Sequence, residues 1–305
     1  MLKITNKISI PILLDLNEDL AWCIGFYFAE GDKTRDYIGV SNCNIDLIKR
    51  FQNIMEEIFK IDRSLWKVHI KTSNKNLNYV KNKWKSSLNL DNINVLYNEL
   101  AKEYNIELRF NSRQFAGFFN NLLGDSITKI LSSKTLSIAF LNGYEVGDGS
   151  VIQRKGFLYG IAFTTKNNAN KDLIVKMFNL HYNIKPRVRI SKGSFEIEIC
   201  GINLMTDLIL DGHFNSHKRK WNTLVQTYLK KQYTRSHIRY WRVLRNSKGI
   251  LDISKLANRS HWSVRDALNK DSKLGIVEVL NKKPKIYKLS RKGEDLLNIL
   301  EGVNV

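Results

Sequence analysis

Residues 20–32 read LAWCIGFYFAEGD, and the same pattern returns at residues 138–150 as IAFLNGYEVGDGS. Each copy predicts a helix that carries two small residues four positions apart and ends in an acid followed by glycine. The small pairs are Gly25 with Ala29 and Gly143 with Gly147, and the acids are Glu30 and Asp148. Small residues at this spacing let two helix backbones approach closely, because no side chain stands between them. The repeat therefore predicts a helix pair whose ends bring the two acids together.

The segments that follow the two copies are also alike. Strand-like runs occur at 37–40 and 158–163, and helices with apolar residues at i, i+3 and i+4 occur at 45–51 and 171–178. Further strand candidates are 66–70, 188–190 and 195–199, and the last two flank a glycine-containing hairpin signal at 191–194. The sequence predicts an α+β protein in which each of two similar halves runs helix, strands, helix, strands, helix.

The net charge of the chain indicates which kind of partner it binds. The 305 residues include 49 Lys and Arg against 29 Asp and Glu, a net charge of +20, which predicts a polyanionic partner. A hydrophobic content of 43% excludes a disordered basic tail. The sequence shows neither an 18-residue apolar window nor a signal-peptide pattern at its start, and its three scattered cysteines fit a reducing compartment. We expect no membrane partner and an intracellular protein, in the cytoplasm of a prokaryotic host or an organelle matrix.

The last quarter of the chain, residues 231–305, holds 17 Lys and Arg against 7 Asp and Glu, half of the net charge. Its pattern predicts helices at 236–246, 253–257, 262–268 and 292–300, with two β-like stretches at 276–280 and 285–289. This order outlines a winged helix-turn-helix, and residues 286–293 resemble the second wing strand and the following helix cap of that family. The third helix would then read base edges in the major groove.

The candidate DNA contacts of this module form two groups. Side chains at the start of the third helix would reach bases: Arg259, Ser260, His261, Trp262 and Arg265. Lysines of the wing would contact phosphates: Lys282, Lys283 and Lys285.

The paired acids have two interpretations. Two carboxylates held close together repel unless a cation lies between them, and hard oxygen ligands beside a phosphate suit Mg²⁺. A metal there can activate water and stabilise the leaving oxygen in phosphodiester hydrolysis. Either copy alone also fits an ordinary helix with a C-terminal glycine cap. The duplication, with the same spacing and the same ending, favours the metal site.

Residues 23–31 and 141–149 resemble the two nonapeptide motifs of the LAGLIDADG homing endonucleases, and the likeness covers roughly residues 10–232. The resemblance implies two pseudo-symmetric αββαββα halves with antiparallel β-saddles, joined at the motif helices and followed here by the winged-helix domain. It also implies a monomer that binds a long double-stranded DNA site and makes a staggered cut with 3′ overhangs. The penultimate acids, Glu30 and Asp148, would bind divalent metal, with Gly31 and Gly149 beside them.

Further roles follow from the resemblance alone. Mg²⁺ is the expected cofactor, with Mn²⁺ able to substitute and Ca²⁺ supporting binding without cleavage. Candidate catalytic lysines are Lys33, Lys166 and Lys218, with Lys220 behind the last; a lysine near the scissile phosphate stabilises developing charge. Candidate DNA contacts on the saddle strands are Asn42, Thr165, Arg187 and Arg189. The first half has Asn42-Cys43 where the second has Thr165-Lys166, so we expect unequal active sites.

The sequence thus predicts a first LAGLIDADG half over 1–110, a linker and second half over 111–232, and a winged-helix domain over 233–305. The favoured function is a site-specific, metal-dependent DNA endonuclease. One alternative is a regulator that binds DNA through a LAGLIDADG domain without cutting it. Another is an intron maturase that binds intron RNA. The acids retained in both motifs favour cleavage.

Overall fold

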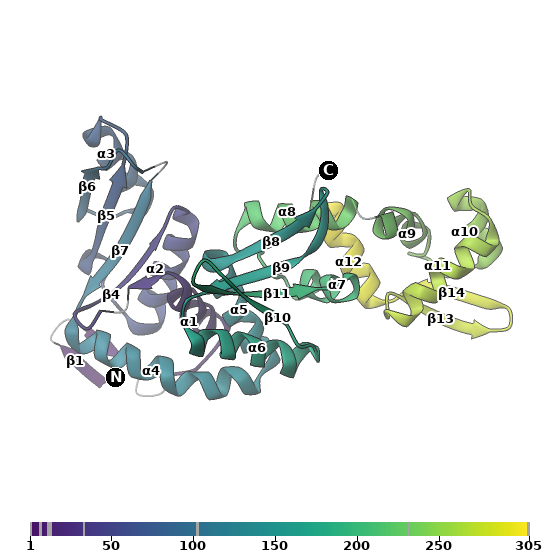
Figure 1. Cartoon of the computed structure of the whole chain (residues 1–305), viewed down its shortest axis with the longest axis horizontal. Helices are drawn as coiled ribbons and strands as arrows, with labels where there is room; N and C mark the ends of the chain where they lie inside the picture. The colour runs from purple at the N-terminus through teal and green to yellow at the C-terminus, as the bar shows by residue number, and fades with distance from the viewer. Residues whose placement is uncertain are drawn as a thin grey trace. The chain divides into compact units, whose positions relative to one another are not determined.

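The computed structural model describes residues 2–5, 8–10, 14–32, 34–101, 104–230 and 232–303. Helices lie beside sheets whose strands pair mostly antiparallel, which confirms the α+β class (Figure 1). The chain forms two compact units, one made of Met1–Gly149 with Phe163–Ile197 and the other of Ser150–Ala162 with Glu198–Val305. The three-domain division expected from the sequence stays a prediction.

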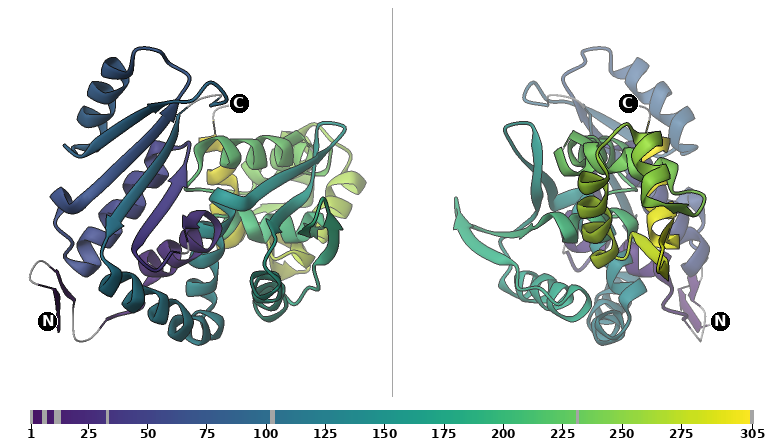
Figure 2. Two further views of the ribbon diagram at one scale, coloured as in Figure 1. Left: turned by 60° about the vertical axis from the view of Figure 1, so that its left-hand side comes forward. Right: turned by 90° about the vertical axis from the view of Figure 1, so that its right-hand side faces the viewer.

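The first half of the repeat begins after a short antiparallel pair, β1 (Leu2–Thr5) and β2 (Ile8–Ile10). Its elements are α1 (Glu18–Glu30), β3 (Gly31–Asp32), β4 (Tyr37–Asn42), α2 (Ile45–Phe59), β5 (Trp66–Thr72), α3 (Leu77–Leu88), β6 (Ile93–Tyr97), β7 (Asn105–Asn111) and α4 (Arg113–Ser132). In the described part of this half the strands form one sheet in the order β3-β4-β7-β5-β6. Figure 1 labels β4, β7, β5 and β6 of this sheet, and Figure 2 shows the same sheet turned toward the viewer.

One connection in this sheet was not predicted from the sequence. Strands β5 and β6 are parallel, from Val68 opposite Ile93 to Thr72 opposite Tyr97, whereas β5 and β7 are antiparallel. Parallel neighbours need a crossover, and α3 supplies it. Only three residues of α3 are buried (Val80, Trp84 and Leu88), one per turn. The apolar residues of this helix therefore form a single narrow stripe. Such a stripe gives a weak helical period, which explains why the helix was not predicted from the sequence.

The second half repeats the first. Its elements are α5 (Lys134–Asp148), β8 (Gly149–Arg154), β9 (Phe157–Thr165), α6 (Asn168–Tyr182), β10 (Arg187–Ser191), β11 (Ser194–Cys200), α7 (Ile202–Leu210) and α8 (Lys218–Lys230). The strand order β10-β11-β9-β8 equals the order β5-β7-β4-β3 of the first half, strand for strand. Strands β10 and β11 are joined by Lys192 and Gly193, both with positive φ, as the predicted hairpin requires. The repeat in the sequence therefore corresponds to a repeated arrangement of strands in the structure.

The motif helices α1 and α5 pack against each other, as the small residues predict. A Cβ atom added to Gly25 would lie 1.9 Å from the carbonyl oxygen of Phe140, and one added to Gly143 would lie 2.0 Å from that of Trp22. At both positions the backbone of the other helix occupies the space of a side chain. Residues Leu20 to Tyr27 of α1 are all buried, so the helix lies inside the core and its sequence reads as a continuous apolar run.

Capping residues set where the two motif helices begin. The side chain of Asn17 accepts a hydrogen bond from the backbone N–H of Leu20 at 2.9 Å, before α1. The side chain of Ser133 accepts one from Leu136 at 3.4 Å, before α5. Each cap satisfies an N–H group that has no partner inside the helix. Both helices then end at the acid of the motif, because an extended glycine follows.

The C-terminal segment follows the predicted order and adds one short strand. Its elements are α9 (Gln232–Val243), β12 (Lys248–Gly249), α10 (Ile250–Ala257), α11 (His261–Lys273), β13 (Val277–Lys282), β14 (Lys285–Leu289) and α12 (Arg291–Gly302). The three strands pair antiparallel in the order β12-β14-β13. The interpretation of this segment as a winged helix stays a prediction.

A buried polar cluster joins α9 to α11. The Nδ1 atom of His237 lies 2.9 Å from both carboxylate oxygens of Asp271, and the Trp241 Nε1–H donates to Asp271 Oδ2 at 2.8 Å. Asp271 has no exposed surface. A buried carboxylate requires such partners, and removing one is costly because an uncompensated charge remains. The cluster fixes the orientation of α11 within this unit.

Among the residues that the structure describes, every helix is too short or too polar to span a lipid bilayer.

Replacement of Gly143 by alanine is expected to lower the free energy of unfolding by about 3 kcal/mol, because the new methyl group overlaps the Trp22 carbonyl. Gly124, in the exposed middle of α4, is the matched control, since a Cβ there meets no atom within 4 Å. Gly124→Ala should instead raise stability by about 0.5–1 kcal/mol, through helix propensity. Urea denaturation measures both. Equal effects of the two substitutions would contradict close packing at Gly143.

Candidate functional site

The helix pair ends in two acids. Helix α1 ends at Glu30 and α5 at Asp148, and a strand begins at the next residue in each case. The backbone N–H groups of Gly31 and Gly149 donate to the carbonyls of Tyr27 and Glu145. Both glycines have extended backbones, with φ of −77° and −93°, whereas a glycine cap of a helix commonly adopts positive φ. Both glycines thus cap their helices, but without the left-handed conformation common at such caps.

The carboxylate of Glu30 is held by its surroundings. Asn42, at the end of β4, donates from Nδ2 to Glu30 Oε1 at 2.8 Å, and its own Oδ1 accepts from the N–H of Asn44 at 2.8 Å. A Cβ atom on Gly147 would lie 2.7 Å from Glu30 Cγ and 2.8 Å from Oε1. The Glu30 carboxylate therefore occupies the space that a side chain at 147 would need, directly beside residue 148. That the two carboxylates themselves meet stays a prediction.

The second acid has a buried tyrosine near it. Burial raises the pKa of Tyr144 to about 12, and the charge of Asp148 acts in the same direction. The Tyr144 hydroxyl donates to the carbonyl oxygen of Thr164 at 3.3 Å. Thr165 is itself only 7% exposed, and its Oγ1 accepts from the N–H of Asn167 at 3.1 Å. The side chain of Thr165 thus shapes the turn after β9, and its predicted role as a DNA contact stays untested.

The donor set fits a hard divalent cation. Glu30 and Asp148 offer carboxylate oxygens from two different helices, and the cradle at Gly147 keeps the first of them beside residue 148. Within the described residues, no group of three or more His, Cys, Asp and Glu side chains could hold a metal ion. Two carboxylates without a full protein cage suit Mg²⁺, which keeps several waters and binds substrate phosphate directly.

A third acid lies next to the first motif and was missed from the sequence. Tyr37 donates from its hydroxyl to Asp32 Oδ2, and the Tyr27 hydroxyl donates to the backbone oxygen of Asp32 at 2.9 Å. The Arg109 guanidinium lies over the Tyr37 ring, 4.5 Å from its centroid. The available signal was the difference between the copies, since Ser150 stands where the first half has Asp32.

The candidate lysines are distributed over both units. Lys33 lies outside the described residues. Lys166 is exposed directly after β9, and Lys218 is exposed at the first residue of α8, in the other compact unit. Lys220 lies over the ring of Phe214, 6.0 Å from its centroid. Their catalytic roles stay predictions.

The saddle strands present cations in both halves. All five residues of β10 are exposed, including Arg187 and Arg189, and Arg189 Nε donates to Glu196 Oε2 at 3.1 Å. In the first half, Lys67 and Lys71 of β5 point away from the buried face. Arg109 of β7 stands directly opposite Lys67 in the strand register. These three cations were not predicted from the sequence, although the alternation of apolar and basic residues in β5 is a signal for the outward position of Lys67 and Lys71.

The start of α11 carries an exposed aromatic residue among polar and basic ones. Trp262 is 56% exposed, the Arg265 guanidinium lies 4.1 Å from its ring centroid, and the His261 ring is 5.1 Å away. Ser260 caps the helix by accepting from Ser263 N–H at 3.3 Å. A pocket beside this cap is lined by polar and basic residues, including Arg259, Lys255 and Asn258. Lys283 and Lys285 are exposed at the turn between β13 and β14.

No protein-family model matches the sequence, and no curated protein matches it. Among solved structures, the chain is similar to the N-terminal LAGLIDADG domain of DUF199/WhiA, at 15% identity and a TM-score of 0.41, over 68% of this chain and 86% of that one. The chain resembles LAGLIDADG proteins. It is also similar to full-length DUF199/WhiA from Thermatoga maritima (14% identity, TM-score 0.43, 87% and 93% of the two chains) and to I-DmoI in complex with DNA and Mn (14%, 0.42, 67% and 99%).

Replacement of Asp32 by asparagine is expected to lower the pKa of Tyr37, which stands at about 12. Burial is the largest cause of that pKa and persists in the variant, so the value should fall only part of the way to 10. The carboxylate favours the protonated phenol, because it accepts the hydroxyl hydrogen and repels a phenolate. Tyrosinate absorbance, compared between wild type, Asp32→Asn and Tyr37→Phe, measures the change. Identical titrations of the wild type and Asp32→Asn would contradict the contact.

Proposed function

We propose that the chain is a site-specific endonuclease that hydrolyses double-stranded DNA with a divalent cation and leaves a staggered break with 3′ overhangs. The observation that carries the proposal is the placement of Glu30 beside residue 148, at the end of a glycine-packed helix pair. Two acids at one point of a chain with a net charge of +20 are poorly suited to bind DNA by themselves. They are well suited to hold a cation that meets the DNA phosphate.

The cation would be held by Glu30 and Asp148, with the backbone at Gly31 and Gly149 beside them. A divalent cation at this place supplies acidity for water and stabilises charge on the leaving oxygen. Mg²⁺ is the expected ion, with Mn²⁺ as a substitute.

The chain's own residues prepare the site. Asn42 donates to Glu30 Oε1, which fixes the direction of the carboxylate. Asn44 holds the Asn42 amide in the orientation that donates. In the second half, Lys166 follows the corresponding strand end and would place a cation near the scissile phosphate. The two sites therefore differ, and we propose that they cut their strands at unequal rates. Lys33 and Lys218 are further candidates for the same electrostatic role.

DNA would be bound by three surfaces. The exposed strands β5 and β10 would contact the major groove through Arg187, Arg189 and their first-half counterparts. Helix α11 would reach base edges with Arg259, His261 and Arg265, as the third helix of a winged helix does. Lys283 and Lys285 would contact phosphates and fix the register.

Cleavage is tested with the purified monomer and a plasmid that carries the uninterrupted insertion site of its own gene. The proposal expects linear product in Mg²⁺ or Mn²⁺ and binding without cleavage in Ca²⁺. Binding without cutting in every metal would favour the regulator alternative. Tighter binding of intron RNA than of duplex DNA would favour the maturase.

Replacement of Glu30 by glutamine, or of Asp148 by asparagine, should abolish cleavage while changing duplex affinity little. Each substitution keeps the shape of the side chain and removes the charge that would hold the cation. Glu57→Gln on the exposed side of α2 is the control and should cut like the wild type. Plasmid linearisation and gel-shift affinity measure the two properties. Full cleavage by either motif variant would remove the basis of the proposal.

Replacement of Arg265 by alanine should weaken binding by about 1–3 kcal/mol and relax base preference at one position. Lys285→Ala should weaken binding equally on all sequences and reduce the slope of log affinity against log salt by about one unit. Selection from a randomised duplex pool and salt titration measure both. If neither substitution changes affinity, the C-terminal segment does not contact DNA.

A further inference from the structure

The sheet of the first half extends one strand farther than its counterpart. Strand β10, which corresponds to β5, is the last strand of the second-half sheet within the described residues. In the first half β6 continues beyond β5, so its outer side forms the edge of that sheet. The addition comprises α3 and β6, between β5 and β7, where the second half has only the two-residue turn at Lys192 and Gly193.

The added strand continues the exposed face of the sheet. Trp66, Val68 and Ile70 of β5 are fully buried, and Ile93 of β6 is 5% exposed, on the face that α3 covers with Val80, Trp84 and Leu88. The alternate residues face the other way. They are Lys67, His69 and Lys71 of β5 and Asn94 and Leu96 of β6, with His69 opposite Asn94 and Lys71 opposite Leu96.

The chemistry of this face suits nucleic acid. Lys67 and Lys71 lie on this face, and the one acid opposite them on β7, Glu107 across from His69, is bound to Arg109. Arg63 is paired with Glu56 and Lys85 with Asp91, at 2.7 Å in both cases. No ion pair holds Lys67 or Lys71 among the described residues, and both are exposed. Free lysines on a strand attract phosphates, an asparagine can bond to adenine, and an apolar side chain can contact a thymine methyl group.

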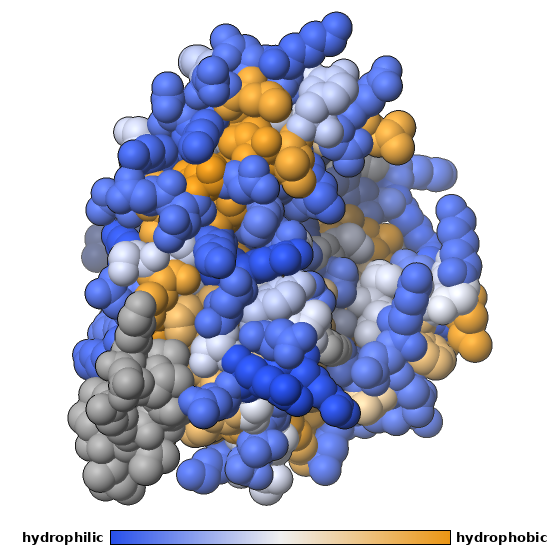
Figure 3. Space-filling model, turned by 90° about the vertical axis from the view of Figure 1, so that its left-hand side faces the viewer, coloured by the Kyte–Doolittle hydropathy of each residue, from blue (hydrophilic) through white to orange (hydrophobic). Residues whose placement is uncertain are grey.

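The outer edge of this sheet is seen in space-filling form from the side of α3 and β6 (Figure 3). Apolar surface lies among hydrophilic side chains there, and Leu96 is 45% exposed. An exposed edge of this kind invites a partner, and the cationic neighbours select a polyanion over a second copy of the same basic chain.

We infer that Lys71, Asn94 and Leu96 lengthen the DNA-contacting surface of the first half at its outer edge, so that the bound duplex is covered farther on that side of the cut than on the other. The inference rests on the proposed function. One strand spacing of about 4.8 Å corresponds to roughly one or two base pairs at about 3.4 Å each.

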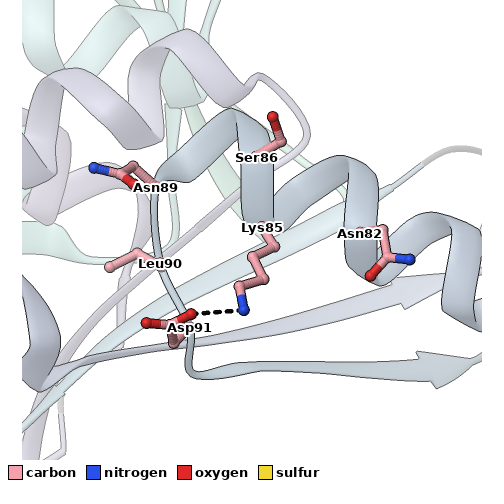
Figure 4. Close-up of a pocket in the computed structure, with 6 residues that line it drawn as sticks. All are labelled: Asn82, Lys85, Ser86, Asn89, Leu90 and Asp91. Atoms are coloured by element: carbon pink, nitrogen blue, oxygen red, sulfur yellow. Dashed lines mark ion pairs between the residues drawn. The ribbon is translucent and has the colours of Figure 1, made fainter.

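A matched control lies in the same inserted segment. Lys81 is exposed on α3, which covers the opposite face of the sheet, so a charge reversal there leaves the proposed surface intact. Lys85 is less suitable because its Nζ is bound to Asp91 across the pocket where α3 ends, as Figure 4 shows. Lys71→Glu and Lys81→Glu therefore make the same change of charge at two exposed positions on different faces of the sheet.

The experiment uses the full chain and a duplex selected by it from a pool with 40 randomised base pairs. Hydroxyl-radical footprints on that duplex are compared for the wild type, Lys71→Glu and Lys81→Glu, with thermal melting as the check on folding. The expected result is that Lys71→Glu loses protection over about one or two base pairs at one end only. Lys71→Ala should reduce the slope of log affinity against log salt by about 0.9, and Lys81→Ala should leave it unchanged.

Three outcomes overturn the inference. An unchanged footprint and slope in the folded Lys71 variants would show that the outer edge does not contact DNA. An equal loss in the Lys81 variants would show a general charge effect. Both results leave the proposed function standing, whereas a chain that selects no duplex at all overturns the proposed function as well.

Discussion

The contact between the backbones of α1 and α5 is the constraint on which the rest of this structure depends. At Gly25 and Gly143 each helix approaches the carbonyl oxygens of the other to a distance that no side chain permits. Glu30 lies against Gly147 only because the helices are this close. Wider packing, of the kind that leucine or valine would impose, would move the two acids apart and remove any shared ligand site. The interface is thus both the centre of the core and the device that sets the spacing of the acids.

The charge of the chain is complementary to this arrangement. Acids at the end of the helix pair repel a phosphate, and the exposed cations of β5 and β10 attract one. Under the proposed function, a duplex drawn to the strands would meet the acids only with a cation between them, and binding of the duplex would then be coupled to binding of the cation. The chain from Arg109 through Tyr37 to Asp32 links a strand side chain to the segment directly after the first motif. The second half has Ser150 in place of Asp32, so the two motif ends differ in charge as well as in their neighbouring strands.

Much of the architecture was predictable because the same sequence pattern occurs in both halves of the chain. The repeat of small residue, small residue, acid and glycine identified α1 and α5, and the hairpin signal at 191–194 identified β10 and β11. The insertion with α3 and β6 was not predictable in this way, because it occurs once and buries one residue per turn. The Asn42 contact to Glu30 depends on where a strand end meets a helix end, and the Asp32 contact depends on a tyrosine five residues later. Neither follows from periodicity, since both are set by the tertiary fold.

In the first half, the strand that follows Glu30 and the added strand β6 lie at opposite edges of one sheet. Strand β3, which continues from Glu30, is at one edge, and β6 is at the other, four spacings or about 19 Å away. Between them lie β4, β7 and β5, whose buried faces share one core. Changes at the outer edge can therefore accumulate, or a segment can be exchanged there, without moving the acids. The chemistry of such a protein can stay fixed while the breadth of its contact with a partner evolves.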